Sequence, residues 1–272
     1  MSGGQLTSAP ARATPVRPAG GVPAFRAFEY FMVAYRRTWR STAISSFILP
    51  LLTVLGFGIG VGAYVTDGVG GVPYLDYLVP GLIASTALQV AISESSWPVL
   101  GNFGWVKIYA AQAATPLRMG DIVSGHLLFA MFRVFTSSVT FLLVAAAFDT
   151  LHSPWALATV PLVLLLGLAV AGPVFAYSST VESDSYLALL FRFAVIPMTL
   201  FGGVFFPVDS LPVVLRWLAY ASPLWHGVDL CRAAALGVAP IWSVPGHLLY
   251  LTVWAVAGWL LARARFRRRL VV

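Results

Sequence analysis

Six apolar runs, each long enough to cross a membrane as a helix, constrain this chain more than any other feature. The hydrocarbon core of a bilayer is about 30 Å thick, and a helix of about 20 residues spans it. The runs cover residues 43–65, 77–97, 122–148, 155–177, 187–206 and 243–262. Only 10% of the residues are charged, against about a quarter in soluble domains. The sequence therefore predicts an all-α, polytopic membrane protein with six transmembrane helices.

The basic residues predict the orientation of these helices. Arginines are concentrated before residue 41 and after residue 262, and the loop at 101–121 contains Lys107 and Arg118, whereas residues 66–76 contain no Lys or Arg. Basic loops remain on the cytoplasmic side of a membrane. Both termini and the 101–121 loop are therefore predicted to be cytoplasmic. Anionic lipid headgroups are a sufficient partner for the net charge of +7, so we expect no nucleic-acid partner.

The segments outside the apolar runs divide the rest of the chain. Residues 1–24 are rich in Pro, Gly, Ala and Arg and predict a disordered cytoplasmic tail. Residues 25–41 mix aromatic residues with arginines, which favours an amphipathic interfacial helix over a polar start of the first span. Residues 42–263 form the predicted six-span transmembrane domain, and 264–272 a basic cytoplasmic tail. The first apolar run begins too late for a cleavable signal peptide.

Residues 209–240 contain two apolar segments that are too short to span a bilayer. Ser222–Pro223 separates them, because proline lacks a donor and disfavours helix in the preceding residue. One additional crossing would place the arginine-rich C-terminus outside, against the charge rule. We therefore predict a re-entrant helical hairpin that enters from the outer side between the fifth and sixth spans and packs on the other helices.

Several catalytic and binding motifs are missing from the sequence. It contains no G-x-x-x-x-G-K-[ST] loop to hold phosphates, no H-E-x-x-H and no C-x-x-C. The single cysteine, Cys231, excludes an internal disulfide and a four-cysteine metal site. We predict no catalytic residue, cofactor or metal for this chain. Work against a gradient would need another chain or an ion flow.

Three charged residues lie inside predicted spans, and one of them, Arg192, is close enough to the start of the fifth span to reach the headgroups. Arg133 is near the middle of the third span, and Glu94 lies towards the cytoplasmic end of the second. Charges at such depth are costly and commonly face a bundle interior, a water-filled cavity or a partner. We therefore place both residues in a candidate translocation path. The alternatives are a structural hydrogen bond for Arg133 and a snorkelling or helix-terminal carboxylate for Glu94. Two groups do not make a proton relay across the bilayer, which argues against a secondary transporter.

Polar residues in the hairpin and the four histidines are further candidate sites. His226, Asp229 and Arg232 follow one another at three-residue intervals, which predicts a polar stripe in which Asp229 and Arg232 can pair. The stripe either seals the outer mouth, orients the hairpin or satisfies itself at the interface. His126 maps to the cytoplasmic half, and His152 and His247 map outside together with His226. Their spacing has no metal-ligand pattern, so solvated or hydrogen-bonded histidines are favoured.

Five short segments, in order, resemble one known family. They are residues 77–82 (Y-L-V-P-G-L), 114–117 (A-T-P-L), 121–125 (D-I-V-x-G), 197–207 (P-M-x-L-F-x-G-V-F-F-P) and 223–233 (P-L-x-H-x-V-D-L-x-R-A). Together they resemble type-2 ABC exporter permeases, particularly the nodulation-factor (lipo-oligosaccharide) and daunorubicin-type drug-export branch. The sequence departs from that family in a nearly neutral 101–114 loop and in His126, where the family often has a glutamate.

The resemblance implies a transmembrane subunit that works with a second permease subunit, identical or paralogous, and two ATPase subunits that bind ATP and Mg. It also implies a multi-pass protein of the bacterial cytoplasmic membrane. The residues expected to couple to the ATPases are Trp105, Lys107, Tyr109, Arg36 and Arg37. Those of the external gate are Phe205, Phe206, Pro207, His226, Asp229 and Arg232.

The expected function is therefore export of an amphipathic substrate, such as a drug, a glycolipid or a lipo-oligosaccharide, by a subunit that is not itself an enzyme. One alternative is a membrane-embedded enzyme that acts on lipid-linked sugars through His152, His226 and His247. A second alternative is a non-transporting membrane scaffold.

Overall fold

The computed structural model describes residues 22–62, 64–65 and 68–270, with the side chains of 41–43, 45, 46, 49 and 59 left outside that description. Most of the predicted tail at 1–24 lies outside the described residues. Within the described part, every regular element is helical, so the predicted all-α class is confirmed there. The elements of the N-terminal half are α1 (Pro23–Leu55), η1 (Gly56–Val61), α2 (Tyr74–Ser95), α3 (Trp97–Gly104), α4 (Ile108–Ala113) and α5 (Met119–Ala147). Those of the C-terminal half are η2 (Pro154–Ala158), α6 (Thr159–Ser178), α7 (Asp184–Leu190), η3 (Phe191–Val195), α8 (Ile196–Phe201), η4 (Val208–Ser210), α9 (Val213–Tyr220), α10 (Pro223–Leu236) and α11 (Val244–Leu270).

Five stretches of helix among the described residues are long and apolar enough to cross a membrane. They are Tyr74–Gly104, Met119–Ala147, Pro154–Ser178, Asp184–Phe201 and Val244–Leu270. These stretches correspond to the second to sixth predicted spans. The first predicted span, residues 43–65, lies in α1, η1 and the residues that follow, and part of it is outside the description. It remains a prediction.

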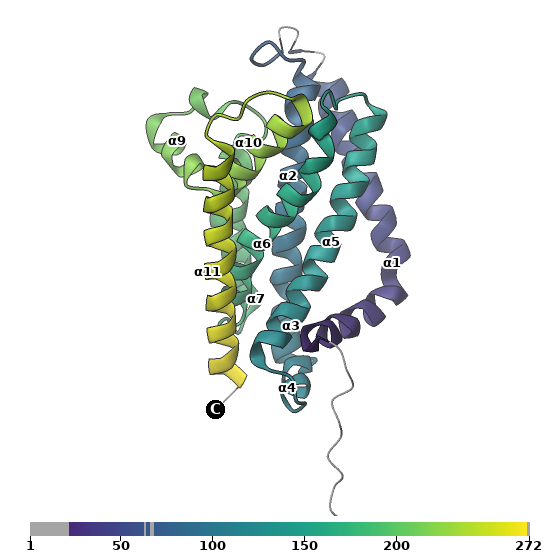
Figure 1. Ribbon diagram of the computed structural model, residues 1–272, viewed down its shortest axis with the longest axis vertical. Coiled ribbons are helices and arrows are strands. Elements are labelled where there is room, and N and C mark those ends of the chain that lie inside the picture. Colours follow the sequence, from purple (N-terminus) through teal and green to yellow (C-terminus); the bar gives the residue numbers. More distant parts are fainter. Residues whose placement is uncertain (1–21, 63, 66–67, 271–272) are drawn as a thin grey trace, which may run out of the picture.

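Helix α1 runs without a break through the predicted boundary between an interfacial and a spanning helix at residues 41–42. Figure 1 shows that the chain nevertheless changes direction within it, since its first part lies across the lower end of the bundle and the rest rises beside α5. Along this first part, Ala27 and Phe31 are buried, whereas Phe25 and Tyr30 are exposed. One face of the segment therefore packs on the protein and the other does not.

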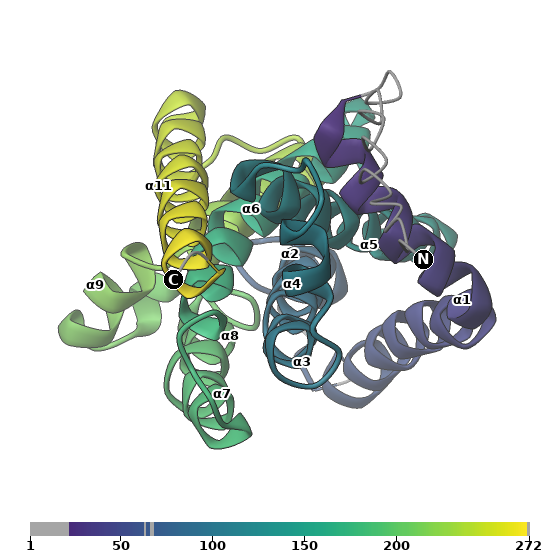
Figure 2. The same cartoon turned by 90° about the horizontal axis from the view of Figure 1, so that it is seen from below.

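Helices α2, α5, α6, α10 and α11 pack around a common core. The approach of α6 to α11 depends on two glycines, because a Cβ added at Gly172 would lie 2.7 Å from the carbonyl carbon of Gly258. Small residues at such a crossing allow two backbones to approach closely in a membrane. Seen from below, α7 and α8 lie on one side of α2 and the second part of α1 lies on another (Figure 2).

Two predicted boundaries are wrong. The fifth span was expected to continue to Phe206, but α8 ends at Phe201 and Gly203 follows with a φ of 79°. This left-handed conformation, which favours glycine, turns the chain out of the helix. The basic segment at 264–272 was expected to be a tail, but α11 continues to Leu270. The arginines therefore lie on the last turns of a helix.

The predicted pair of short helices after the fifth span is present as α9 and α10. Ser222 caps α10, since its hydroxyl oxygen accepts a hydrogen bond from the Leu224 amide at 3.2 Å. Pro223 occupies the first turn of that helix, where its missing N–H would have no partner in any case. The two helices lie at the upper end of the molecule in Figure 1, opposite the C-terminus.

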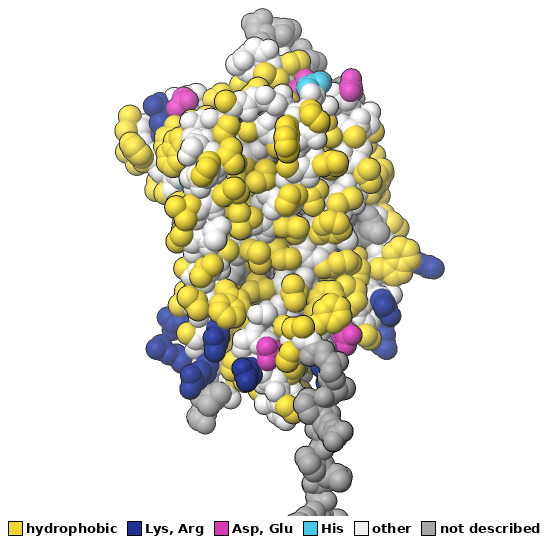
Figure 3. Space-filling view, viewed as in Figure 1, with side chains coloured by type: hydrophobic (Ala, Val, Ile, Leu, Met, Phe, Trp, Pro, Cys, Tyr) yellow, Lys and Arg dark blue, Asp and Glu magenta, His cyan; other side chains and the backbone are white. Residues whose placement is uncertain are grey.

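Charged side chains gather at the two ends of the molecule, with a mostly hydrophobic surface between them (Figure 3). Lys and Arg side chains predominate at the lower end, where the C-terminal helix also ends. This distribution agrees with the rule that places basic residues on the cytoplasmic side of a membrane.

Candidate functional site

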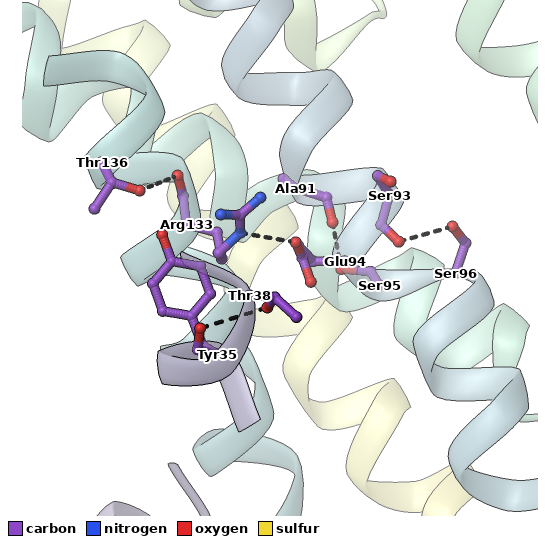
Figure 4. Close-up of polar contacts among 9 residues, drawn as sticks. All are labelled: Tyr35, Thr38, Ala91, Ser93, Glu94, Ser95, Ser96, Arg133 and Thr136. Atoms are coloured by element: carbon purple, nitrogen blue, oxygen red, sulfur yellow. Dashed lines mark hydrogen bonds and ion pairs between the residues drawn. The ribbon is translucent and has the colours of Figure 1, made fainter. Parts of the chain in front are cut away.

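The two charged residues predicted in the translocation path form an ion pair with each other. Arg133 on α5 donates from Nε to Glu94 Oε1 on α2 at 3.0 Å (Figure 4). The two side chains are 16% and 19% exposed. Tyr35 of α1 lies beside the pair, with its ring centre 5.2 Å from the guanidinium carbon. The pair therefore connects α2 and α5 next to α1.

Pairing changes the cost of placing these charges in the bundle. An unpaired charge in a membrane interior is expensive, whereas an opposite charge and the face of an aromatic ring both reduce the cost. Glu94 is therefore held by a partner within the protein and does not snorkel, and it lies in the last turn of α2, as the helix-terminal alternative predicted. Part of the surface of the pair remains exposed beside α2.

Polar side chains form a row on the exposed side of α2. Gln89 and Ser93 are exposed and Thr86 is half-buried, and the three follow one another at helical spacing. The Gln89 side chain donates to Ser85 Oγ at 3.3 Å. Trp97, 38% exposed at the start of α3, follows four residues after Ser93. The spacing of these polar residues within the second apolar run was the signal that could have identified this row from the sequence.

The loop between α2 and α5 contains the short helix α4, which is anchored in the bundle by Tyr109. This side chain is fully buried, and its hydroxyl lies 2.5 Å from His126 Nδ1 of α5 in a hydrogen bond. The His126 ring stacks on Phe31 of α1 with ring centres 4.1 Å apart. It also meets Phe175 of α6 edge to face at 4.9 Å. Tyr109 and His126 thus connect α4 to three other helices.

The remaining residues expected to couple to ATPases lie at the surface. Trp105 is 72% exposed, and Lys107, Arg36 and Arg37 are also exposed. Lys107 has a φ of 54°, a left-handed conformation that turns the chain immediately before α4. The structure therefore divides the five predicted coupling residues into four that a partner can contact and one, Tyr109, that fixes the loop.

At the opposite end, two of the histidines predicted to be outside come together. His226 Nδ1 of α10 lies 2.8 Å from His247 Nδ1 of α11, and His226 Nε2 hydrogen bonds to the Tyr220 carbonyl at 3.0 Å. His247 Nε2 is 3.0 Å from Asp229 Oδ2, which is close enough for an ion pair but lacks the geometry of a hydrogen bond. Burial, and then the nearby His247, lowers the pKa of His226 to about 4.

Among the described residues, Asp229 and Arg232 do not form the ion pair that their spacing allows. Asp229 accepts a hydrogen bond from the Ile241 amide at 2.8 Å and lies beside His247. Arg232 instead donates to the carbonyl oxygens of Tyr77 and Gly203 at 3.3 and 2.9 Å, and its guanidinium carbon lies 3.8 Å from the centre of the Tyr77 ring. Asp229 and Arg232 therefore each contact groups that are distant in the sequence.

The remaining gate candidates occupy different environments. Phe205 packs on Phe57 of η1, with ring centres 5.3 Å apart. Phe206 packs against a small cluster that contains Val208 and Trp225, and Pro207 is exposed. His152 does not join His226 and His247, because its Nε2 pairs with Asp76 Oδ2 at 2.9 Å. In the described part of the chain, no group of three or more His, Cys, Asp or Glu side chains could hold a metal ion.

Helices that can cross a membrane, together with polar side chains exposed along one of them, are features of a membrane transport protein. The chain belongs to the ABC-2 type transporter family, whose sequence pattern matches residues 27–236. This finding confirms the resemblance drawn from the sequence.

The relatives agree with this family. Nodulation protein J of Rhizobium leguminosarum bv. viciae is 30% identical over 254 residues, which are 93% of this chain and 97% of the relative. Nodulation protein J of Rhizobium leguminosarum bv. trifolii is 31% identical over 86% of this chain and 90% of its own. The inner membrane transport permease YadH of Escherichia coli K12 is 24% identical over 82% and 89%, respectively.

Proposed function

We propose that this chain is the transmembrane subunit of an ABC exporter in a bacterial cytoplasmic membrane. Together with a second permease subunit, it forms a path for an amphipathic substrate, and two separate ATPase subunits supply the energy. The family match and the relatives support the permease role. The name of nodulation protein J does not identify the cargo of this chain, so we propose only the amphipathic class, which includes drugs, glycolipids and lipo-oligosaccharides.

The observation that carries this proposal is the exposed polar row on α2. Gln89 and Ser93 lie on a helix whose composition suits lipid, yet they are exposed on the surface of the subunit. Polar side chains inside a membrane characteristically face a water-filled cavity or another protein chain. A path between two permease subunits provides both environments, and the Glu94–Arg133 pair contributes charge at its edge.

The cytoplasmic end of the proposed exporter contains the contacts with the ATPases. Trp105, Lys107, Arg36 and Arg37 are exposed there and available to a partner. Tyr109 and His126 connect α4 to the bundle, so a displacement of this loop by an ATPase would be transmitted to α5. The proposal includes six spans, the first of which runs through α1 and η1, with both termini in the cytoplasm.

On the outer side, α9 and α10 form a re-entrant hairpin that closes the path together with residues 205–207. The apolar face of α9 supports this arrangement, since Val213, Val214, Trp217 and Leu218 are each at least 62% exposed. Such side chains are stable in lipid or against a second subunit. Arg232 holds the hairpin to the start of α2 and to the turn at Gly203.

The alternative enzyme that uses three histidines is not favoured. His152 pairs with Asp76, whereas His226 and His247 lie together between α10 and α11. The three side chains therefore do not form one catalytic centre in this structure. The scaffold alternative differs from the exporter because it requires no hydrated path.

Thiol labelling of α2 tests the exporter proposal. Gln89→Cys and Ser93→Cys, co-produced with the ATPase subunits in membranes, should react with a small charged methanethiosulfonate, and ATP should change their reaction rates. Val253→Cys is the control, because Val253 is 57% exposed on the apolar surface of α11 and should face lipid. The native Cys231 is buried and should contribute little background. Labelling of both α2 positions at only the rate of the Val253 variant would contradict the hydrated path.

A further inference from the structure

A cavity of about 150 Å³ lies at the hairpin end of the molecule, and the proposed gate does not explain it. It lies between α10, the start of α2, the segment after α8 and the segment before α11. Its wall includes Tyr77, Asp209, Trp225, Asp229, Arg232 and Ala233. The volume equals that of about five water molecules at about 30 Å³ each. It is therefore large enough for a small polar ligand.

Arg232 provides hydrogen-bond donors at this cavity. Its guanidinium is fixed by the carbonyl oxygens of Tyr77 and Gly203 and by the Tyr77 ring. A guanidinium has five N–H donors, and these two bonds use only two of them. Within the described residues, no carboxylate forms an ion pair with Arg232. A partly buried cation is thus held in place with donors remaining.

Other groups on the cavity wall complete a mixed set of donors and acceptors. Trp225 is 2% exposed, and its indole N–H donates no hydrogen bond to any described residue. Asp229 uses Oδ2 for the Ile241 amide, and Asp209 uses Oδ1 for the Tyr220 hydroxyl. Each carboxylate retains a second oxygen that has no hydrogen-bond partner in the described part of the chain. Trp225 and Asp229 are buried side chains, and buried polar groups normally have partners, so their free groups are suited to a ligand. Asp209 is exposed and adds an acceptor that solvent also reaches.

The signs of these groups restrict the ligand. Two carboxylates would repel a bound anion, and the fixed guanidinium would repel a cation. A neutral ligand with several hydroxyls can bind both the donors and the acceptors on the cavity wall, because each hydroxyl both donates and accepts. We propose that this cavity is a binding site for one neutral sugar ring, presented from the outer side. The site does not depend on the direction of transport or on ATP.

Filling the cavity tests the proposal. Ala233→Leu places a larger side chain at a lining position of the cavity. Ala234→Leu makes the same change at the adjacent position of α10, which does not line the cavity. Each purified protein in phosphatidylcholine nanodiscs would be titrated with methyl β-glucoside, and saturation-transfer NMR would report contact with the sugar. We expect binding by the native protein and by Ala234→Leu, and at least about tenfold weaker binding by Ala233→Leu.

A second variant covers the case in which Ala233→Leu does not fold. Val238 lines the same cavity and is 46% exposed, so Val238→Trp should narrow the mouth without disturbing the interior and should also weaken binding. Absence of saturation transfer in the native protein would overturn the proposal and leave the cavity as a site for water. Equal binding by the native protein and both cavity variants, or displacement of the sugar by acetate at matched ionic strength, would also overturn it. None of these outcomes affects the labelling expected on α2.

Discussion

At the residue scale, the Arg133–Glu94 pair illustrates a limit of reading one residue at a time. Each side chain was predicted to give polarity to a path, and the sequence contains no signal that pairs positions 39 residues apart. The structure brings them together because α2 and α5 pack side by side. The contribution of the pair to stability can be measured by removing the partners separately and together.

Arg133→Met should lower the free energy of unfolding by about 2–3 kcal/mol. This is below the range of about 3–5 kcal/mol for fully buried pairs, because water reaches part of both side chains. Glu94→Gln in the same protein should recover part of the loss, with a coupling energy of about 0.5–3 kcal/mol in the double-mutant cycle. Thermal unfolding in detergent measures each step. Arg192→Met is the matched control, since Arg192 is exposed on η3 and forms no ion pair within the described residues. Strictly additive effects would show that the two charges do not interact.

Tyr109→Phe tests the buried hydrogen bond between α4 and α5. The change keeps the ring contacts with Phe103 and Phe266, at 4.6 and 4.9 Å between ring centres, but leaves His126 Nδ1 without its partner. We expect a loss of about 1–3 kcal/mol in unfolding free energy. Tyr30→Phe, at a 44% exposed position of α1, should have little effect. Replacing both hydrogen-bonding partners, as in Tyr109→Phe with His126→Leu, should cost less than Tyr109→Phe alone. An equal loss for the Tyr109 and Tyr30 variants would indicate that this bond adds no stability.

At the element scale, the second to sixth apolar runs predicted the helices well, because a bilayer leaves few other structures for such segments. Sequence patterns also located the break at Ser222–Pro223, where a capping serine and a proline act locally. The contacts of the hairpin were not predictable in the same way. Asp229 and Arg232 are one turn apart, but His247 and Tyr77 come from distant elements and compete for them. Helical spacing limits which neighbours are possible and does not reveal the tertiary partners.

The loop that contains α4 can be tested as an ATPase contact with two tryptophans of equal exposure. Trp105 and Trp155 are both 72% exposed, and they lie in different loops, before α4 and in η2 respectively. Trp105→Ala should reduce copurification of the ATPase subunits, or their substrate-stimulated ATP hydrolysis, by about tenfold, the equivalent of about 1.4 kcal/mol of contact energy. Trp155→Ala should leave both unchanged. Similar losses in the two variants would point to a general loss of folding, and no loss in either would remove Trp105 from the interface.

At the scale of the whole molecule, the unpaired surfaces are as informative as the core. Only 11% of the helix stretch Asp184–Phe201 is buried inside the subunit. The corresponding share for the most apolar 18 residues of Tyr74–Gly104 is 72%. Phe193 and Ile196 are 77% and 51% exposed on this outlying helix. Lipid or another protein chain must cover these side chains. Composition predicted that the chain is a membrane protein, but it could not show which helices stand apart, because that depends on packing between distant segments.

The arrangement of the two ends in the membrane can be tested on intact cells. Leu157 is 74% exposed in η2, and Arg268 is exposed near the end of α11, at opposite ends of the molecule. If basic residues mark the cytoplasmic side, a membrane-impermeant maleimide should label Leu157→Cys in spheroplasts and should label Arg268→Cys only after the membrane is broken. The protein with its buried Cys231 alone gives the background. Labelling of Arg268→Cys in intact spheroplasts would place the arginine-rich end of α11 outside. An external end would leave the Trp105 loop, at the same end of the bundle, out of reach of cytoplasmic ATPases, and the coupling proposal would fail with the topology.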